Sequence, residues 1–328
     1  MKFVSYISGV QERLGLLVNG HIVDVELAHE AQRQHASFQL GRMPDNILDV
    51  LDLGNAALHD ARIIVDNCRH MNEAPYMFPA DHGTLLSPVP HPTSMRDGYA
   101  FRQHVEAARR NRGLDMIPEF DEIPIFYFTN HNAVTGPGIV EVQDMHLHQC
   151  DFELECAIVI GKEGRNIAAS EADEYIFGYM VMNDWSARAL QMHEMKLNLG
   201  PAKGKDFATS LGPWLVTRDE LASRRINTPH GEKYQLAMSA RLNGKEVSRA
   251  DLSDMSWTFA QIIERASYGV TLYPGDVIGS GTCGTGCFLE LNGSKVFDPP
   301  LWVKDGDVME CEIEMLGVLS NTIRRTGP

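Results

Sequence analysis

The segment spanning residues 150–161 reads CDFELECAIVIG and predicts a buried strand with an acidic entrance. Successive side chains of a strand point to opposite faces, so Glu153 and Glu155 lie on the same face. Beyond Glu155 both faces are apolar, which is typical of a central strand. Two like charges at such an entrance are unfavourable unless a cation lies between them, which favours a metal ion. The alternative is a solvated strand end with two surface glutamates.

A second segment, residues 177–188, reads FGYMVMNDWSAR. Its apolar half predicts a strand that ends at Asp184, where a helix follows. Either Asp184 or Ser186 has the chemistry to cap that helix. Capping does not account for Arg188 and Gln191, which follow at helical spacing and place a cation and an amide on one face. Asp184 is therefore a further candidate for the acidic site.

A third segment, residues 94–112, predicts one long helix. Asp97 and His104 are then two helical turns apart and share a face, so that one can bind a metal ion while the other acts as a base. The alternative is a surface histidine beside a helix N-cap.

The composition excludes several classes of protein. The 328 residues are 44% hydrophobic and 22% charged, as in an ordinary globular protein. A net charge of −15 disfavours nucleic acid and anionic membranes as partners. Because no long apolar run or leader-like N-terminus is present, we expect a cytoplasmic protein without a membrane partner. Six cysteines in this setting predict reduced thiols, and a glycine-rich loop explains Cys283 and Cys287 better than a redox or zinc knuckle.

The chain divides into two predicted domains. Alternating apolar residues around an Asn-Gly turn predict a small N-terminal β-meander, and helical patterns follow at 44–53 and 55–70. We therefore expect a small α+β domain at residues 1–80 and a catalytic domain at 81–328, with the proline-rich stretch 86–92 as a linker.

The larger domain is predicted to be rich in strands. An Asn243-Gly244 dipeptide predicts a hairpin, and the strict alternation of a doubly wound α/β fold is missing, so the fold class is α+β. Besides the helix at 94–112, we expect helices at 186–197 and 257–267, and strands at 124–129, 152–161, 175–183, 213–217, 234–242, 270–278 and 308–315.

Together these segments resemble the fumarylacetoacetate hydrolase (FAH) family from about Leu86 to the C-terminus. The matching motifs occur in family order: Arg96-Asp97 with Arg102-Gln103-His104, then DFELE at 151–155, MNDWSAR at 182–188 and GKDFAT at 204–209. The resemblance implies a mixed β-roll catalytic domain, usually a homodimer, that binds Mg²⁺ or Mn²⁺, with Ca²⁺ as a further option. Carried over by position, the four metal ligands are Asp97, Glu153, Glu155 and Asp184.

The resemblance also implies roles for other side chains. His104 corresponds to the histidine that activates water, assisted by Glu290, while Arg188, Gln191 and Lys205 resemble the residues that stabilise an oxyanion. Thr282 resembles a substrate-binding position, and Tyr127 is a further candidate for contacting the substrate. The implied activity is cleavage of a carbon-carbon bond in a β-diketo acid such as fumarylacetoacetate, fumarylpyruvate or another acylpyruvate, in aromatic catabolism. The first domain is not similar to the family and the loop 281–288 is compressed, which leaves the acyl group open.

Three other readings compete with a hydrolase. The same metal site supports a 2-oxo acid decarboxylase or an enol–keto isomerase, because all of these reactions pass through an enolate. His146 and His148, followed by Glu153, approximate the ligand set of a cupin-like metalloprotein. A non-catalytic binding protein would retain the metal residues without needing His104 and Glu290. The water-activating histidine favours hydrolysis.

Overall fold

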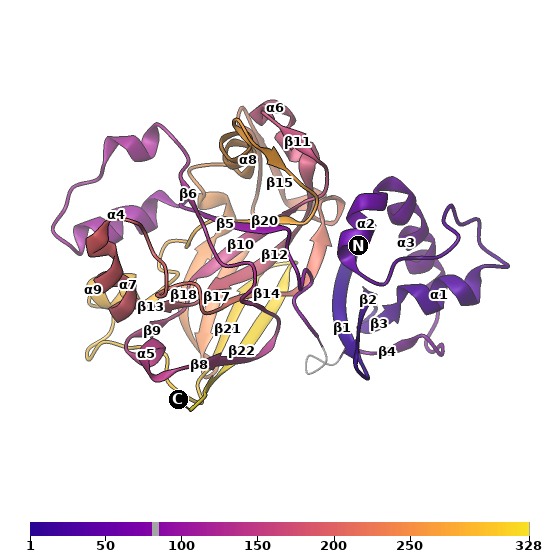
Figure 1. Cartoon of the computed structure of the whole chain (residues 1–328), viewed down its shortest axis with the longest axis horizontal. Helices are drawn as coiled ribbons and strands as arrows, with labels where there is room; N and C mark the ends of the chain where they lie inside the picture. The colour runs from indigo at the N-terminus through magenta and orange to yellow at the C-terminus, as the bar shows by residue number, and fades with distance from the viewer. Residues whose placement is uncertain (81–84, 328) are drawn as a thin grey trace.

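The computed structural model describes residues 1–80 and 85–327. Over these residues an eleven-stranded sheet has the order β4-β3-β2-β1-β14-β12-β10-β20-β5-β6, with β7 beside β14 (Figure 1). In that order the strands are Met77–Pro79, His21–Asp24, Gln11–Val18, Lys2–Ser8, Thr209–Thr217, Ile176–Asp184, Leu154–Ile160, Asp276–Gly279, Ser94–Gly98 and Phe126–Phe128, and β7 is Val134–Thr135. Most pairs are antiparallel, whereas β20 with β5 and β14 with β7 are parallel.

A five-stranded sheet packs against this one. Its order is β18-β17-β21-β22-β8, and its strands are Lys245–Asp251, Ala237–Leu242, Val308–Ile313, Gly317–Arg325 and Gly138–Val142. The main hydrophobic core combines Ile158 and Val181 of the first sheet with Met238 and Ile313 of the second. Burial of these apolar faces against each other holds the two layers together. The predicted strand-rich α+β class is confirmed.

The helices surround the sheets (Figure 1). They are α1 (Val25–Gln32), α2 (Ile47–Leu53), α3 (Asn55–Cys68), α4 (Arg102–Arg110), α5 (Asp144–Leu147), α6 (Ala169–Ala172), α7 (Arg188–Glu194), α8 (Phe259–Ser267) and α9 (Phe288–Gly293). Short strand pairs are β9 (Cys150–Asp151) with β13 (Ser186–Ala187), β11 (Gly164–Arg165) with β19 (Thr271–Leu272), and β15 (Arg225–Thr228) with β16 (Gly231–Tyr234). Among residues 1–80 and 85–327, no helix combines the length and the apolar character needed to span a bilayer.

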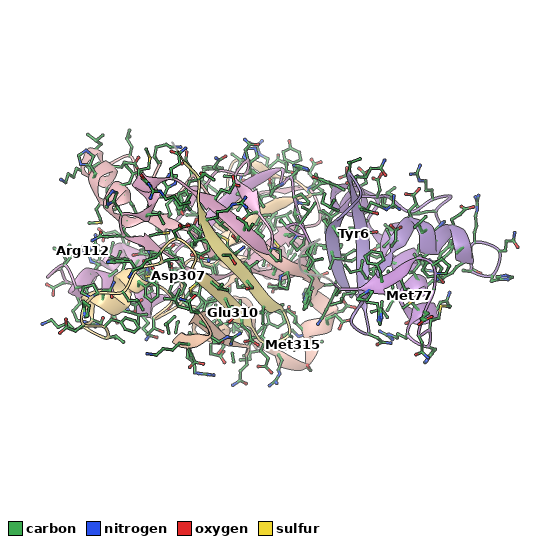
Figure 2. All side chains as sticks on the ribbon, turned by 90° about the horizontal axis from the view of Figure 1, so that it is seen from below. Tyr6, Met77, Arg112, Asp307, Glu310 and Met315 are labelled. Atoms are coloured by element: carbon green, nitrogen blue, oxygen red, sulfur yellow. The ribbon has the colours of Figure 1, made fainter. Side chains whose placement is uncertain are left out.

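The N-terminal strands extend the large sheet. Strand β1 pairs with β14, with Lys2 opposite Val216, so the meander and the strands around the site form one continuous sheet. Tyr6 and Met77 of this N-terminal module lie at one end of the molecule, and Arg112 lies at the other (Figure 2). The proposed boundary at residue 80 adjoins residues 81–84, which lie outside the described residues, and it stays a prediction.

The turn predictions are confirmed. Asn19 and Gly20 have φ values of 49° and 80°, and Asn243 and Gly244 have 51° and 78°, the positive values that primed hairpin turns require. The stretch 86–92, predicted as a linker, packs against the rest of the protein. Val89 is fully buried, and the Ser5 hydroxyl donates to the Pro88 carbonyl at 3.0 Å.

The predicted helix at 94–112 is wrong in its first part. Residues Ser94–Gly98 form strand β5, and helix α4 begins only at Arg102. Pairing with β20, more than 180 residues later in the chain, fixes the extended conformation. The two strands approach so closely that a Cβ at Gly98 would lie 2.9 Å from the Gly279 carbonyl oxygen. A local helical pattern cannot detect such a non-local partner.

Other element predictions need smaller corrections. The expected strands at 234–242 and 270–278 are each interrupted, so that β16 and β17, and β19 and β20, are separate. The expected helix at 186–197 opens with strand β13, continues as α7 and ends in a 3₁₀ turn at Met195–Leu197. The remaining 3₁₀ turns are Pro118–Asp121, Asp173–Tyr175, Arg218–Arg224 and Leu252–Asp254.

Candidate active site

Three acidic side chains on and beside strands β5 and β10, which flank β20 in the large sheet, converge. Asp97 lies on β5, Glu155 on β10, and Glu153 just before β10. Each offers a carboxylate oxygen, and these oxygens all lie within 4.8 Å of one another. None of the three residues is more than 5% exposed. The structure therefore places Glu153 and Glu155 together, as the alternation of the strand predicts, and adds Asp97.

The fourth predicted ligand, Asp184, is joined to this group by Lys205. The Lys205 Nζ atom donates to Asp184 Oδ2 at 2.7 Å and also to Glu153. The Tyr127 hydroxyl donates to the same Asp184 oxygen at 2.5 Å, and Thr209 donates to the other oxygen at 3.4 Å. Asp184 does not cap the following helix, since the N-cap residue of α7 is Ala187 and no described side chain caps it.

Arg188 links the acidic group to the outer part of the site. Its Nη2 donates to Glu153 at 2.6 Å, and its Nη1 donates to Gln191 at 3.0 Å, so the expected Arg188–Gln191 pair is formed. Its Nε donates to Asp151 at 2.8 Å. Asp151 also accepts the backbone N–H groups of Phe288 and Leu289 at 2.7 and 2.9 Å. The sequence analysis missed Asp151, which lies on β9, two residues before Glu153.

His104 and Glu290 form a pair although 186 residues separate them in the chain. Nδ1 of His104 lies 2.7 Å from Glu290 Oε2, and the other oxygen of Glu290 accepts the Thr285 N–H at 2.9 Å. The ring of Tyr99 meets His104 edge-on, with 5.9 Å between centroids. His104 reaches the site because α4 starts directly after β5. Asp97 lies on strand β5 and His104 on helix α4, so the predicted helical face that they would share does not exist.

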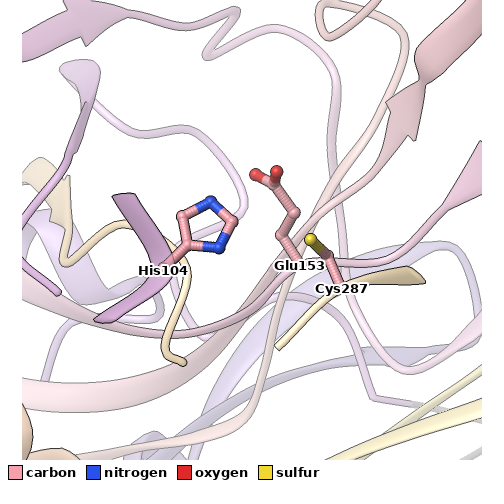
Figure 3. A group of neighbouring side chains, drawn as sticks. All are labelled: His104, Glu153 and Cys287. Atoms are coloured by element: carbon pink, nitrogen blue, oxygen red, sulfur yellow. The ribbon is translucent and has the colours of Figure 1, made fainter. Parts of the chain in front are cut away.

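Cys287 is a further residue that the sequence analysis left out of the site. His104, Glu153 and Cys287 each offer a donor atom within 4.8 Å of the others, and Figure 3 shows the three neighbouring side chains. All three are buried. The six cysteines are free thiols, as predicted.

The pKa values of the carboxyl groups in the acidic group are shifted in opposite directions. Burial, and then the charges of Asp97 and Glu153, raise the pKa of Glu155 well above its usual value. Burial, and then Asp184, raise the pKa of Asp97 to about 7. Burial would also raise the pKa of Glu153, but Lys205 and Arg188 outweigh it and lower that pKa to about 2. Lys205 and Arg188 therefore compensate Glu153, whereas Asp97 and Glu155 form no ion pair among the described residues.

The residues fit a hard divalent cation. Glu155 Oε2 is buried and has no hydrogen-bond partner among the described residues, which is costly unless a ligand satisfies it. Gly279 leaves the necessary room, because a Cβ there would lie 2.4 Å from Asp97 Oδ1. Carboxylate oxygens are the donors that Mg²⁺ and Mn²⁺ prefer. Asp97, Glu153 and Glu155 would hold the ion, with Asp184 beside them.

Two predicted substrate residues support the acidic group directly. The Thr282 hydroxyl donates to Glu155 at 3.3 Å, and Tyr127 holds Asp184 as described above. The cupin interpretation finds no support, because neither group of potential metal ligands among residues 1–80 and 85–327 includes His146 or His148. His146 instead stacks on Phe207, with ring centroids 4.2 Å apart.

A strand-rich α+β fold with buried carboxylates beside a histidine–glutamate pair is an arrangement that suits metal-assisted catalysis. Residues 93–324 match the family described as fumarylacetoacetate (FAA) hydrolase C-terminal, and the chain belongs to this family. It is an enzyme of the FAH superfamily. Enzymes of this family generally depend on a divalent metal ion, which agrees with the acidic group.

Relatives and solved structures extend over nearly the whole chain. Oxaloacetate tautomerase YisK of Bacillus subtilis is 29% identical over 313 residues, which is 93% of this chain and 95% of that protein. Mitochondrial oxaloacetate tautomerase Fahd2a of Rattus norvegicus is 32% identical over 285 residues, covering 86% and 80% of the two chains. The solved structure of a fumarylacetoacetate hydrolase from Exiguobacterium antarcticum aligns with a TM-score of 0.72 and 25% identity, over 99% of this chain and 100% of that one.

Proposed function

We propose that this chain is a divalent-metal-dependent tautomerase that interconverts the keto and enol forms of a small 2-oxo acid of the oxaloacetate type. The observation that carries the proposal is the likeness to two proteins named oxaloacetate tautomerases, which extends over 86% to 93% of this chain. Of the activities expected from the sequence, the isomerase alternative fits these relatives better than the C–C bond hydrolase does. A cytoplasmic location and a homodimer remain predictions from the sequence.

The pair of His104 and Glu290 suits the proton transfer that tautomerisation requires. With Nδ1 donating to Glu290, the Nε2 atom is left to take a proton from the carbon beside the 2-oxo group and to deliver it to the enolate oxygen, which gives the enol; the reverse transfer restores the keto form. The proton shuttles between substrate atoms, so the histidine ends in its starting state. A divalent cation, when bound to the acidic group, supplies the Lewis acid that polarises the 2-oxo oxygen.

Lys205 and Arg188 act as fixed positive charges in this proposal. Burial would lower the pKa of Lys205, but Asp184 and Glu153 outweigh it and raise that pKa, so the ammonium group stays charged. The pKa of Arg188 is raised in the same way by Glu153 and Asp151. In this proposal both cations stabilise the negative charge of an enolate bound beside them, without giving up a proton.

Hydrolysis of a β-diketo acid is the second candidate. The observation in its favour is the same His104–Glu290 pair, because a histidine held by a carboxylate also activates water. The solved fumarylacetoacetate hydrolase of Exiguobacterium antarcticum shares the fold over the full chain. Hydrolysis differs from tautomerisation in one requirement, which is a water molecule placed against the distal carbonyl carbon.

One comparison separates the two activities. The chain, stripped of metal and then supplied with Mg²⁺ or Mn²⁺, is given the enol form of oxaloacetate in one assay and a series of acylpyruvates in another. A tautomerase speeds the loss of enol absorbance without releasing carbon fragments, whereas a hydrolase releases pyruvate together with the carboxylic acid of the acyl group. His104→Asn with the metal retained is the control for the uncatalysed reaction. Absence of metal-dependent turnover in both assays would overturn the enzyme proposal.

A further inference from the structure

Asp151 lies between two parts of the candidate active site that come from different segments of the chain. Its side chain is fully buried, and Oδ2 accepts the Arg188 Nε–H at 2.8 Å and the Leu289 N–H at 2.9 Å. The other oxygen accepts the Phe288 N–H at 2.7 Å and the Phe152 N–H at 3.0 Å. A carboxylate accepts about four hydrogen bonds, so Asp151 has no capacity left for a substrate or a metal ion.

The first part that Asp151 holds is Arg188. The guanidinium group of Arg188 donates to Asp151 through Nε and to Glu153 through Nη2, the latter at 2.6 Å. The donors of a guanidinium group are planar and rigid, so a partner at Nε also sets the direction of Nη2. In addition, Asp151 on β9 pairs with Ser186 on β13, two residues before Arg188. Asp151 therefore fixes both the backbone before Arg188 and the direction of its charge.

The second part is helix α9, which carries Glu290. The first N–H groups of a helix have no partner inside the helix. In α9 these groups include the N–H of Phe288 and of Leu289, and Asp151 accepts both. Glu290 is the next residue, and its carboxylate lies 2.7 Å from Nδ1 of His104. Asp151 thereby fixes the end of α9 from which Glu290 reaches His104.

We propose that Asp151 is a positioning residue that couples the two parts of the site. It directs Arg188 toward the enolate and, through the start of α9, keeps Glu290 on His104. Asp151 takes no part in proton transfer itself. Its effect on turnover rests on the proposed function, whereas the coupling between Asp151 and His104 stands on the hydrogen bonds alone.

Asp151→Asn tests the proposal at nearly constant side-chain size. An amide replaces one acceptor oxygen by an NH₂ group, which meets two of the four N–H donors with donors of its own. With Mg²⁺ and enol oxaloacetate, kcat should fall on the order of 10²-fold, the cost of misplacing reacting groups by about 1 Å. KM should stay close to that of the native chain, because the misplaced groups act on the enolate and the transferred proton.

Nuclear magnetic resonance of the full chain labelled with ¹⁵N-histidine tests the coupling without substrate. The ring nitrogen shifts of His104 report its tautomer, and His104→Asn identifies these signals by removing them. We expect a single tautomer with the proton on Nδ1 in the native chain and a mixture of tautomers in Asp151→Asn. Arg188→Lys removes the bond from Nε to Asp151 but leaves α9 untouched, so it should lower kcat and leave the His104 tautomer unchanged.

Asp60→Asn is the matched control. Asp60 is also fully buried and accepts two backbone N–H groups, those of Gln39 and Leu40, but it belongs to the N-terminal module. This variant should melt at a lower temperature while kcat per folded molecule and the His104 signals stay unchanged. Asp151→Ser is the second variant if the asparagine form does not fold, as judged by circular dichroism.

The outcomes separate this proposal from the proposed function. A native His104 tautomer in the folded Asp151 variants overturns the coupling, even if kcat falls, because Arg188 alone then carries the effect. Loss of the tautomer in Arg188→Lys overturns the role of α9. A mixture of tautomers in Asp151→Asn, with a native chain that has neither tautomerase nor hydrolase activity, supports the coupling and removes only the proposed function.

Discussion

Buried carboxylates occur both in the N-terminal module and in the candidate active site, but their hydrogen-bond partners differ. In the N-terminal module, Asp24 accepts hydrogen bonds from Tyr6, from Arg13 and from the Leu27 N–H at the start of α1. Asp60 accepts the N–H groups of Gln39 and Leu40 at 2.8 and 2.9 Å. Burial would raise the pKa of both acids, but these partners outweigh it and lower both values.

Asp97 and Glu155 of the candidate active site are equally buried but form no ion pair among the described residues, and they accept only the Gly281 N–H at 3.1 Å and the Thr282 hydroxyl at 3.3 Å. The pKa values of Glu155 and Asp97 are raised, and Glu155 keeps an oxygen without a partner among the described residues. The difference shows that burial alone does not assign a role. An acid whose partners all come from the chain stabilises the fold, whereas an acid left short of positive charge destabilises the empty protein and is suited to a ligand.

The largest expected effect tests this contrast at Glu155. Glu155→Gln keeps the shape but removes a ligand charge, so metal-dependent turnover should fall on the order of 10³-fold, because the Lewis acid contributes several kcal/mol. The melting temperature of the metal-free protein should nevertheless rise, since the substitution relieves repulsion with Asp97 and Glu153. Enzyme assays and thermal melts in chelator measure the two effects. A lower melting temperature without metal would contradict the contrast.

The second effect concerns His104. Replacing it by asparagine removes the proton-transfer group, so turnover should fall about 10²–10³-fold. The affinity for Mg²⁺ should remain close to that of the native chain, because the oxygen donors are intact. The measurement is turnover at saturating Mg²⁺ together with the thermal shift that Mg²⁺ causes. A variant that loses the Mg²⁺-induced shift would show that His104 supports the metal instead.

The third effect belongs to the N-terminal module. Asp24→Asn removes the charge that Arg13 and Tyr6 surround, and the free energy of unfolding should fall by about 3 kcal/mol. Turnover per folded molecule should not change. Urea unfolding measures the loss, and Glu30→Gln, which alters an exposed ion pair with Arg33, is the control with little expected change. Equal losses in the two variants would remove the special role of Asp24.

The smallest effect is a difference in pH dependence. The lowered pKa values of Asp24 and Asp60 give stability that is present above their unfolded values near 3.8 and is lost as pH falls through the folded values. The raised pKa of Asp97 has the opposite effect on stability. The stability that its bound proton contributes is lost as pH rises through about 7.

Metal binding should reveal the pH dependence that the raised pKa of Asp97 causes. Below pH 7 a cation has to displace the proton of Asp97, so Mg²⁺ should raise the melting temperature about 2–4 °C more at pH 8 than at pH 6. Thermal melts at both pH values with and without Mg²⁺ measure the difference, and the Asp97→Asn variant should lose it. Equal shifts at the two pH values would argue against Asp97 as a ligand.

The sequence by itself determined the local features of this protein. Strand alternation predicted that Glu153 and Glu155 lie together, and Asn-Gly dipeptides located two hairpin turns, because these features depend on residues close together in the chain. The ordered motifs from Asp97 to Lys205 indicated the family that residues 93–324 confirm. Helical periodicity failed at residues 94–98, where pairing with β20 overrides the local preference.

Only the tertiary structure decided how the site is completed. It brought Glu290 to His104 across 186 residues, placed Cys287 beside them, and assigned Asp151 to hold Arg188. It also left Glu155 Oε2 without a partner among the described residues. None of these features has a local pattern, because each depends on side chains brought together by sheet pairing and helix packing between distant segments.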